Sequence, residues 1–490
     1  MNHLSRITFI SETTDRFRRF MPRQLTGKQF VFSVALVCLI ALFSLLRADF
    51  NYIDDTGRVF YGYRGWDNFS RYTSNFLSVI IHTNKVLSDI SPLPQIIAIG
   101  LMAISSYLFT KLVHHQETFS ISQIAGVVPL CLSPWFLECL SYKFDSPYMA
   151  LSVMAALLPF TFRHSSGIQW LVAFLCAIVV CTTYQVSLSV FMISFVLVVA
   201  HKWNRGEAVR SIASQLGGIA VSFVSGVLFF KFFILNPVDS YVSSSLNLSY
   251  IPRNLVNFYN TVLGDLPRLW KVLISLVACG FVITFIQSST RPKIAALIIG
   301  LAALCGFLLC SFGLYSLLEK PLFSPRACYG FGIAIAACSV YTVASNRNLI
   351  LKAPTLILAW TLFVFTFEYG NALNYQAKYT DFRVQLVIND LNDIDDFNNL
   401  PNIYLNTKGN IGKAPIIRKR IEKKSPLRRL IPSTLGSSDW MWNTFSLLHH
   451  YKLRSVKIVA DNETGEEILK DNRYHTISKT GNRFFIYFKE

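Results

Sequence analysis

Long apolar runs without Asp, Glu, Lys or Arg recur along the whole chain, and each approaches the length that crosses a lipid bilayer. A transmembrane helix needs roughly 20 apolar residues, with a range of about 17 to 25. The runs lie at 29–46, 94–110, 121–137, 147–162, 168–183, 185–200, 211–230, 272–287, 294–316, 329–345 and 353–367. Hydrophobic residues make up 52% of the chain and charged residues 15%, which excludes an ordinary soluble domain. We therefore predict an α-helical polytopic membrane protein with about eleven transmembrane helices.

Basic residues between the runs predict the orientation of the chain. The formal net charge is +18, and Lys and Arg fall mostly at the ends of runs and in one late polar segment. This distribution fits membrane topology and lipid phosphates better than nucleic acid, so we expect no nucleic-acid partner. The basic segment 1–28 lacks a cleavage site of small residues before the first run, so we interpret it as cytoplasmic and the first helix as retained. Basic flanks on both sides of 165–200 favour two crossings there, and the C-terminus is then on the outer side.

With this orientation the region 29–368 forms a transmembrane domain, and residues 369–490 form an outer domain. The predicted outer loops are 47–93, 138–146, 231–271 and 317–328. Apolar residues near helical spacing at 74–90, and more weakly at 253–270, predict amphipathic helices lying in the membrane interface.

The outer domain is polar and rich in Asn, Asp, Lys and Arg. Residues 377–396 have a helical pattern, 403–405 and 456–459 have strand patterns, and 474–488 is typical of a hairpin about Gly481-Asn482. We therefore expect a small α/β domain.

Two adjacent carboxylates, Asp54 and Asp55, follow the first apolar run. Two acids side by side near a low-dielectric boundary repel each other, so one proton is held more tightly, and a base near neutrality can deprotonate a sugar hydroxyl. Arg58 would lie on the same face of a helix and could orient a carboxylate or hold a phosphate. A solvated acidic loop would have the same sequence, so both interpretations stay open at this point.

A second polar group lies in Glu138-Cys-Leu-Ser-Tyr142-Lys-Phe-Asp145-Ser-Pro147. In a helix, Glu138, Tyr142 and Asp145 would share one face, and Pro147 would start the next helix. The acids would then lie at the depth of Asp54 and Asp55. An ordinary polar hairpin is the alternative.

Two cations at the outer ends of runs are candidates for binding a lipid-linked phosphate. Arg326 follows a proline and could bind phosphate with two parallel hydrogen bonds, and Lys231 ends the seventh run. A side chain reaching from a helix end to the interface explains either residue equally well. A basic run at 418–429 could attract anionic lipid or glycan, although a solvated loop is the simpler interpretation. There is no Walker loop, dinucleotide fingerprint or His/Cys metal cluster, and we expect no metal site and no cofactor.

Several of these segments in combination resemble one protein family. They are Ile53-Asp54-Asp55-Thr-Gly-Arg58, Trp135-Phe-Leu-Glu138-Cys-Leu-Ser-Tyr142-Lys-Phe-Asp145-Ser, Thr183-Tyr184-Gln185, Ser324-Pro-Arg326 and Glu368-Tyr369-Gly370-Asn371-Ala372-Leu373. The combination resembles the serotype-converting O-antigen glucosyltransferases of phages and prophages in enteric bacteria, over residues 45 to about 390.

This resemblance implies a GT-C-like fold in the bacterial inner membrane with a periplasmic active site. It implies transfer of glucose from undecaprenyl phosphate-glucose to a lipid-linked O-antigen of lipopolysaccharide, with an acid of the first outer loop, Asp54 or Asp55, as the base. Tyr184 and Gln185 join Arg58, Glu138, Tyr142, Asp145, Lys231 and Arg326 as candidate substrate-binding residues. Membrane lipids, a transferase that makes the donor and a flippase that delivers it are the expected partners.

Two other classes of protein remain as alternatives. A transporter or lipid-linked sugar flippase usually carries ionisable residues near the midplane, whereas these runs lack Asp, Glu, Lys and Arg. An O-antigen polymerase or ligase would use a diphosphate-linked glycan as donor, so the identity of the donor separates it from a glucosyltransferase.

Overall fold

The computed structural model describes residues 24–162, 166–236, 245–346, 348–421, 425–433, 435–436, 456–459 and 463–490. Most of the predicted cytoplasmic segment 1–28 and residues 422–424 of the basic run therefore lie outside the described residues.

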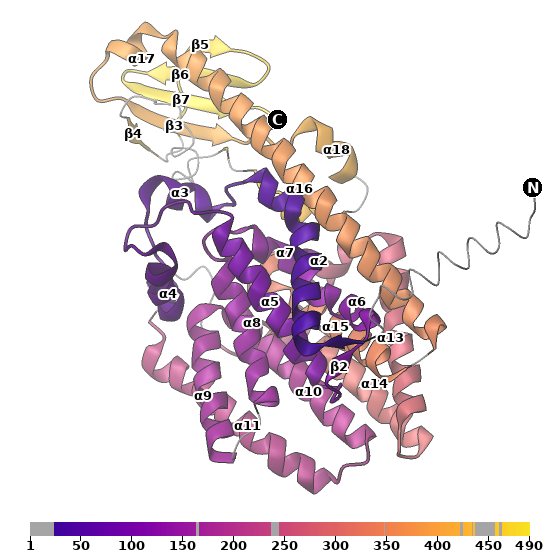
Figure 1. Cartoon of the computed structure of the whole chain (residues 1–490). Coiled ribbons are helices and arrows are strands. Elements are labelled where there is room, and N and C mark those ends of the chain that lie inside the picture. Colours follow the sequence, from indigo (N-terminus) through magenta and orange to yellow (C-terminus); the bar gives the residue numbers. More distant parts are fainter. Residues whose placement is uncertain are drawn as a thin grey trace, which may run out of the picture.

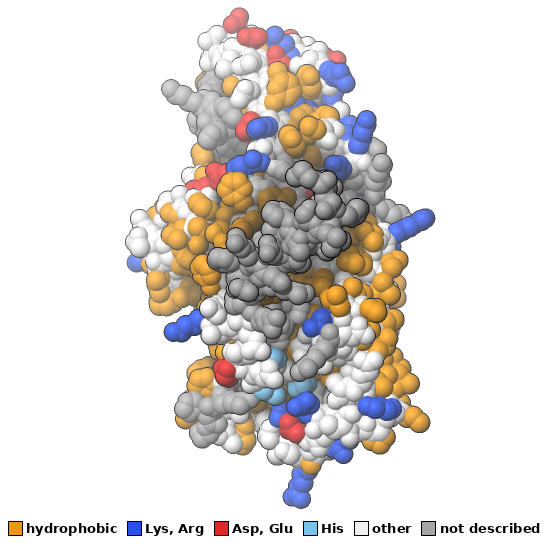
Figure 2. Space-filling view, turned by 45° about the vertical axis from the view of Figure 1, so that its right-hand side comes forward, with side chains coloured by type: hydrophobic (Ala, Val, Ile, Leu, Met, Phe, Trp, Pro, Cys, Tyr) orange, Lys and Arg blue, Asp and Glu red, His pale blue; other side chains and the backbone are white. Residues whose placement is uncertain are grey.

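Eight described helices are long and apolar enough to cross a membrane. They are α2 (Gly27–Ala48), α5 (Leu93–Lys111), α9 (Ser166–Thr183), η2 (Gln185–Ser187) with α10 (Leu188–Asn204), α11 (Val209–Phe229) with η3 (Phe230–Ile234), α13 (Arg268–Ser288), α14 (Lys293–Cys310) and α16 (Leu349–Asn392). Their outer faces carry large exposed apolar side chains, such as Phe32, Phe233 and Ile294, as a lipid-facing surface requires. Figure 2 shows hydrophobic side chains along the helical body, with Lys and Arg gathered towards its ends.

The three remaining predicted runs form less regular structures. The pair α6 (Ile121–Leu132) and α7 (Pro134–Ser141) is bent by 61°, because Pro134 disfavours helical geometry at Ser133. The helices α8 (Ser146–Thr161) and α15 (Gly330–Ser345) have 16 residues each, about 24 Å at 1.5 Å per residue, against a hydrocarbon core of about 30 Å. By length and composition the described helices thus support eight or nine spans, and the count of eleven stays a prediction.

Helix packing places α15 at the centre of the helical body. Nearly all of its residues are buried, and it packs against α6, α10, α13 and α14. A helix that is apolar all round is expected in such a position. At the periphery α2 packs against α16, where Gly370 lets the backbone of α2 approach. A Cβ atom added to Gly370 would lie 2.3 Å from the backbone nitrogen of Leu45.

Short helices lie in the predicted outer loops: α3 (Asp54–Tyr61), α4 (Tyr72–His82) and α12 (Ile251–Gly264). The helix predicted at 74–90 is wrong beyond His82. Thr83 adopts a left-handed conformation with φ 53° and ends α4, and the Asn84 side chain then accepts a hydrogen bond from Val86 N–H. Leu77 and Ile81 pack on Trp66 and its buried neighbours. The helix predicted at 253–270 is confirmed only as far as Gly264, where α12 ends, because Pro267 precedes the start of α13 at Arg268.

The helix α16 joins the membrane body to the C-terminal sheet without a break. Its 44 residues span about 66 Å, roughly twice the hydrocarbon thickness. The predicted span at 353–367 and the predicted helix from 377 to 392 are therefore one element, and the expected boundary at 369 falls inside it. The helix predicted at 377–396 is wrong beyond Asn392, because Ile394 is extended and a separate short helix, α17 (Asp395–Asn399), follows. Figure 1 shows α16 running from the helical body up to the sheet.

The C-terminal sheet has the strand order β4-β3-β7-β6-β5. The strands are β3 (Tyr404–Gly409), β4 (Lys457–Ile458), β5 (Glu467–Asp471), β6 (His475–Thr480) and β7 (Arg483–Phe488). β3 pairs in parallel with β4 and β7, and the other pairs are antiparallel. Val384, Val387 and Leu391 of α16 form one core with Ile477 and Phe484 of the sheet. The predicted strands and the hairpin about Gly481-Asn482 are confirmed.

The remaining described elements are short. They are β1 (Leu25–Thr26), β2 (Thr118–Phe119), η1 (Asp67–Phe69), η4 (Leu248–Tyr250), η5 (Gly313–Leu317), η6 (Pro325–Ala327), α17 (Asp395–Asn399), α18 (Pro415–Ile421) and α19 (Leu427–Leu430).

Candidate active site

The adjacent carboxylates occupy the first turn of α3 and differ in their surroundings. Ile53, which precedes them, has φ 45° and ψ −95°, a strained conformation for a β-branched residue. Asp54 is half-buried, while Asp55 is 0% exposed. Asp55 Oδ2 accepts hydrogen bonds from the backbone N–H groups of Tyr52 (3.1 Å) and Lys143 (2.9 Å). Asp55 Oδ1 is buried and has no hydrogen-bond partner among the described residues.

Burial raises the pKa of Asp55 to about 8. Removal from water disfavours the charged form, and the nearby Asp145 carboxylate adds to the effect, while the Lys143 N–H and the Arg58 and Lys143 charges oppose it. The carboxyl therefore changes protonation near neutral pH, as a general base for a hydroxyl group requires.

Arg58 is paired with Asp145 through its guanidinium, and both side chains are buried. Trp66 Nε1 donates to the other carboxylate oxygen of Asp145 at 2.6 Å, and the Arg58 guanidinium carbon lies 4.3 Å from the centroid of the Trp66 ring. Of the two roles predicted for Arg58, the geometry has it orienting a carboxylate. Two buried charges are tolerated here because each is matched and hydrogen-bonded.

Lys143 ties the first outer loop to the turn between α7 and α8. Its buried ammonium lies 2.6 Å from Asp49 Oδ1 and 3.0 Å from Asp89 Oδ2, while its backbone N–H binds Asp55. The sequence placed Lys143 within the second polar group but gave it no role. Only the tertiary structure brings its two acidic partners to it.

Glu138 and Arg326 meet beside these carboxylates. Glu138 Oε2 accepts a hydrogen bond from the backbone N–H of Arg326 at 2.5 Å, and the Tyr184 hydroxyl donates to the Arg326 carbonyl at 3.2 Å. The Arg326 guanidinium carbon lies 4.9 Å from the centroid of the Tyr142 ring. The Tyr142 ring in turn lies 4.8 Å from the Tyr52 ring, edge to face. We call Asp54, Asp55, Arg58, Glu138, Tyr142, Asp145, Tyr184 and Arg326 the carboxylate cluster.

The structure assembles this cluster by a different route from the predicted one. A single helical face carrying Glu138, Tyr142 and Asp145 is wrong, because α7 ends at Ser141 and Tyr142 is extended. Asp145 instead precedes α8, whose first turn contains Pro147 as predicted. The turn between the two helices brings Asp145 close enough to Asp55 for the two carboxylates to interact.

Two predicted residues lie apart from the cluster. Lys231 is exposed in η3, with its ammonium 5.8 Å from the centroid of the neighbouring Phe232 ring. Gln185 begins η2 and is half-buried. Among the described residues, neither side chain forms a hydrogen bond or an ion pair with the carboxylate cluster, although Gln185 directly follows Tyr184 in the chain.

Residues missed by sequence analysis connect the cluster to the C-terminal region. The hydroxyl groups of Tyr52 and Tyr369 donate to the Leu430 carbonyl at 2.9 and 3.3 Å, and Ser141 Oγ lies 2.7 Å from the Tyr369 hydroxyl. In the sequence, Tyr369 lies just beyond the run 353–367, within the segment Glu368–Leu373 that resembles the family, and nothing there pointed to these contacts. No group of three or more His, Cys, Asp or Glu in the described ranges could hold a metal ion.

Comparison with known proteins gives two matches. The family model described as glucosyl transferase GtrII matches residues 43–337, which is more than half of the chain and includes every member of the carboxylate cluster. A protein of Salmonella phage P22, described as an uncharacterized 55.3 kDa protein in the gtrB 5′ region, is 24% identical over 460 residues. That alignment covers 87% of this chain and 92% of the phage protein. No solved structure matches.

Proposed function

Since the chain belongs to the glucosyl transferase GtrII family, we propose that it transfers glucose from undecaprenyl phosphate-glucose to the O-antigen of lipopolysaccharide, which causes serotype conversion. The phage relative is described by its position in the gtrB 5′ region, which supports a role for this chain in a serotype-conversion locus. We place the reaction on the periplasmic side of the bacterial inner membrane, with a GT-C-like arrangement of spans. A transferase that makes the donor and a flippase that delivers it are the proposed functional partners.

The observation that carries this proposal is the environment of Asp55. Its Oδ2 is fixed by two backbone N–H groups, its Oδ1 is buried without a partner among the described residues, and its pKa is raised to about 8. A fixed carboxylate that titrates near neutrality is suited to accept a proton from a sugar hydroxyl. We therefore assign the base to Asp55 and keep Asp54, which is half-buried beside it, as the comparison.

In the proposed step the acceptor hydroxyl oxygen attacks the anomeric carbon of the donor glucose. The bond between this carbon and the phosphate oxygen breaks, and undecaprenyl phosphate leaves with the electron pair of that bond. The hydroxyl proton passes to Asp55, and the anomeric centre is inverted. General-base assistance of this kind contributes about 100-fold to 10,000-fold in rate.

Arg326 is the cation best suited to receive the departing phosphate. Its side chain is half-buried, and within the described ranges no carboxylate forms an ion pair with its guanidinium. Arg58, in contrast, is occupied by Asp145. Glu138 holds the Arg326 backbone and so positions this guanidinium over Tyr142. Charge that develops on the phosphate is stabilised by such a placed donor.

We propose that the reaction needs no metal ion. Both oxygens of Asp145 and one oxygen each of Asp55 and Glu138 are already bound by protein donors. Transfer by the purified protein is therefore expected to persist in EDTA. Loss of transfer in EDTA that added Mg²⁺ restores would overturn this part of the proposal.

The test is transfer by the purified full chain in detergent, with undecaprenyl phosphate-glucose as donor and a lipid-linked O-antigen repeat as acceptor. D55N is expected to lose at least about 100-fold in rate, and D54N to lose much less. A D55N variant that folds and keeps full activity would refute the assignment.

The same assay separates the alternatives. A flippase would give no new glycosidic bond in detergent, where there is no membrane to cross. A polymerase or ligase would require a diphosphate-linked donor.

A further inference from the structure

A cavity lies at the opposite end of the helical body from the carboxylate cluster. Its volume is about 790 Å³, within the range of small-molecule sites, and it is formed by α5, α8, α9, α10 and α11 with the segment that follows α5. Asp145 precedes the first turn of α8, and the last turn of α8 lines the cavity. The 16 residues of α8 separate the two places by about 24 Å.

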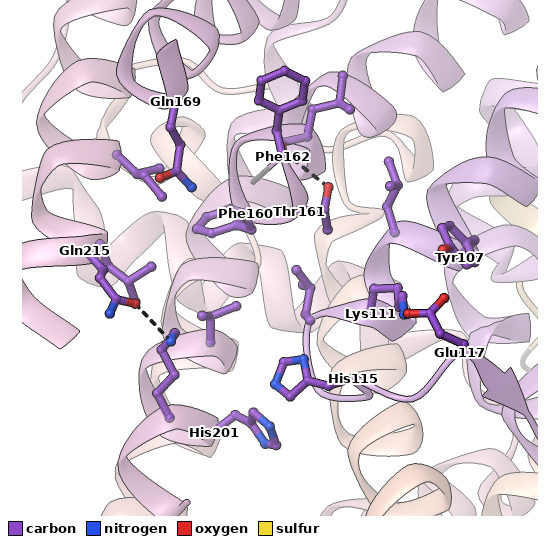
Figure 3. Close-up of a pocket in the computed structure, with 17 residues that line it drawn as sticks. Tyr107, Lys111, His115, Glu117, Phe160, Thr161, Phe162, Gln169, His201 and Gln215 are labelled. Atoms are coloured by element: carbon purple, nitrogen blue, oxygen red, sulfur yellow. Dashed lines mark hydrogen bonds and ion pairs between the residues drawn. The ribbon is translucent and has the colours of Figure 1, made fainter. Parts of the chain in front are cut away.

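The wall of this cavity, which we call the α5–α11 cavity, combines apolar side chains with basic and amide side chains and one carboxylate, Glu117. Leucine, valine, isoleucine and phenylalanine side chains line much of it. Lys111 and Lys202 supply ammonium groups, and His115 and His201 supply imidazole rings. In Figure 3 the rings of His115 and His201 lie beside each other, with Lys111 and Glu117 nearby. The ring centroids of His115 and His201 are 5.5 Å apart.

His201 is the most informative residue of the cavity. Its side chain is buried, with 5% of the residue exposed, yet both ring nitrogens lack a hydrogen-bond partner among the described residues. Buried polar groups are nearly always satisfied, and leaving one without a partner costs about 1 to 3 kcal/mol. An imidazole that lines a cavity in this condition indicates a ligand with polar atoms.

The two lysines indicate that this ligand carries negative charge. Lys111 Nζ lies 3.0 Å from Glu117, whose side chain is 87% exposed. Lys202 Nζ lies 2.9 Å from Glu207 and donates to Gln215 at 3.0 Å. An ion pair with an exposed partner contributes little to stability, so an arriving anion can displace Glu117 from Lys111. Glu207 is half-buried and contacts Lys202 Nζ with both carboxylate oxygens, so Lys111 is the more readily available of the two ammonium groups. Two ammonium groups and two imidazoles around one space favour a phosphate.

We propose that the α5–α11 cavity binds the phosphate headgroup of a membrane lipid at the end of the helical body opposite the carboxylate cluster. Lys111, Lys202 and His201 would bind the phosphate oxygens, and the apolar wall would contact the first part of the hydrocarbon chains. The lining helices α5, α9, α10 and α11 are all long enough to cross a membrane, so membrane lipids would surround the cavity and could enter it. Their basic residues lie where lipid phosphates are expected.

The test uses the purified full chain, stripped of lipid in detergent, and native mass spectrometry. The probes are dioleoyl phosphatidic acid and dioleoylglycerol, which has the same chains without the phosphate. Phosphatidic acid is expected to stay bound and dioleoylglycerol to dissociate. H201L and the double variant K111Q/K202Q should each weaken retention of phosphatidic acid by about tenfold or more, because each removes hydrogen bonds to a charged ligand.

K28Q is the matched control. Lys28 is an exposed cation at the start of α2, outside the cavity, and K28Q should bind phosphatidic acid as the wild type does. H201L should unfold no more easily than the wild type without lipid, because it removes two unpartnered buried nitrogens. This result would show that its loss of binding is local.

Three results would overturn the inference. They are equal retention of the two lipids, wild-type affinity in both H201L and K111Q/K202Q, and displacement of phosphatidic acid by an equal concentration of inorganic phosphate. The last result would assign the cavity to a free anion. None of these measurements depends on glucosyl transfer, so their outcome leaves the proposed reaction to its own test.

Discussion

Replacing Asp55 by Asn should make the protein more stable at neutral pH while it removes the proposed base. Asp55 is 0% exposed and its pKa is raised to about 8, whereas an aspartate in an unfolded chain titrates at about 3.9. Asn has nearly the shape of a protonated Asp, and its amide oxygen can accept the same bonds from Tyr52 and Lys143 N–H. The fold should therefore tolerate the change.

The sign and size of the effect follow from proton linkage. Below about pH 4 the carboxyl is protonated in both the folded and the unfolded protein, so its ionisation does not lower the free energy of unfolding. Between about pH 4 and pH 8 the unfolded chain is ionised while folded Asp55 keeps its proton, so the free energy of unfolding of the wild type falls by about 1.4 kcal/mol per pH unit. Above the pKa of folded Asp55 the carboxyl is ionised in both states, and the free energy of unfolding falls no further. D55N cannot ionise, so its advantage over the wild type should grow by about 4 kcal/mol between pH 4 and pH 7.

The assay is unfolding of the purified protein in mixed micelles by SDS, followed by tryptophan fluorescence at pH 5, 6, 7, 8 and 9. D54N is the matched control, because it removes a carboxylate from the same turn of α3 and leaves Asp55 in place, so the fall in stability caused by Asp55 should remain. Parallel profiles for D55N and the wild type would refute the reasoning. A D55N protein that is more stable at pH 7 and inactive would identify a carboxylate kept for function at the expense of stability.

Three further changes test other contacts. R58M should lower the free energy of unfolding by about 3 to 5 kcal/mol, because it leaves the buried Asp145 carboxylate without its cation; a loss below 1 kcal/mol in SDS unfolding would contradict this. E138A should cost about 1 to 3 kcal/mol and slow transfer, whereas E138Q keeps an acceptor for the η6 N–H and should stay close to the wild type in both measurements. G370A should cost about 1 to 3 kcal/mol where α2 and α16 touch, while G217A, whose added Cβ meets nothing within 4 Å, should be neutral or stabilising; equal effects would argue against close packing there.

The sequence predicted most of the individual elements. Apolar runs without charge marked every helix or helix pair of the described membrane body. A segment that crosses lipid must pair its backbone N–H and C=O groups within the protein and carry apolar side chains. The hairpin about Gly481-Asn482 was also readable, because only a few residues suit its tight turn. The prediction of a helix at 74–90 was wrong beyond His82, because Thr83 adopts a left-handed conformation and ends α4. Threonine rarely adopts this conformation, so the sequence did not indicate the end of the helix.

The candidate site could be predicted only in part. The acids Asp54, Asp55, Glu138 and Asp145 were identified from their position beside apolar runs, and six further predicted residues had the same basis or a family resemblance. The single helical face expected for Glu138 and Asp145 was wrong, since the chain reverses between α7 and α8. The unbroken 44-residue α16 was read as two elements, because its polar half lies outside the apolar run.

By itself the sequence determined that this chain lies in a membrane and carries acids beside its apolar runs. It could not decide which acid is buried, since burial depends on neighbours distant in sequence: Lys143 supplies a backbone N–H to Asp55 from 88 residues away. The tertiary structure alone gave Asp55 its raised pKa and gave Arg58 its partner Asp145. It also left His201 buried without a partner in a cavity. Local patterns determine which segments enter lipid, whereas the electrostatics of a site depend on which charges and dipoles the fold brings together.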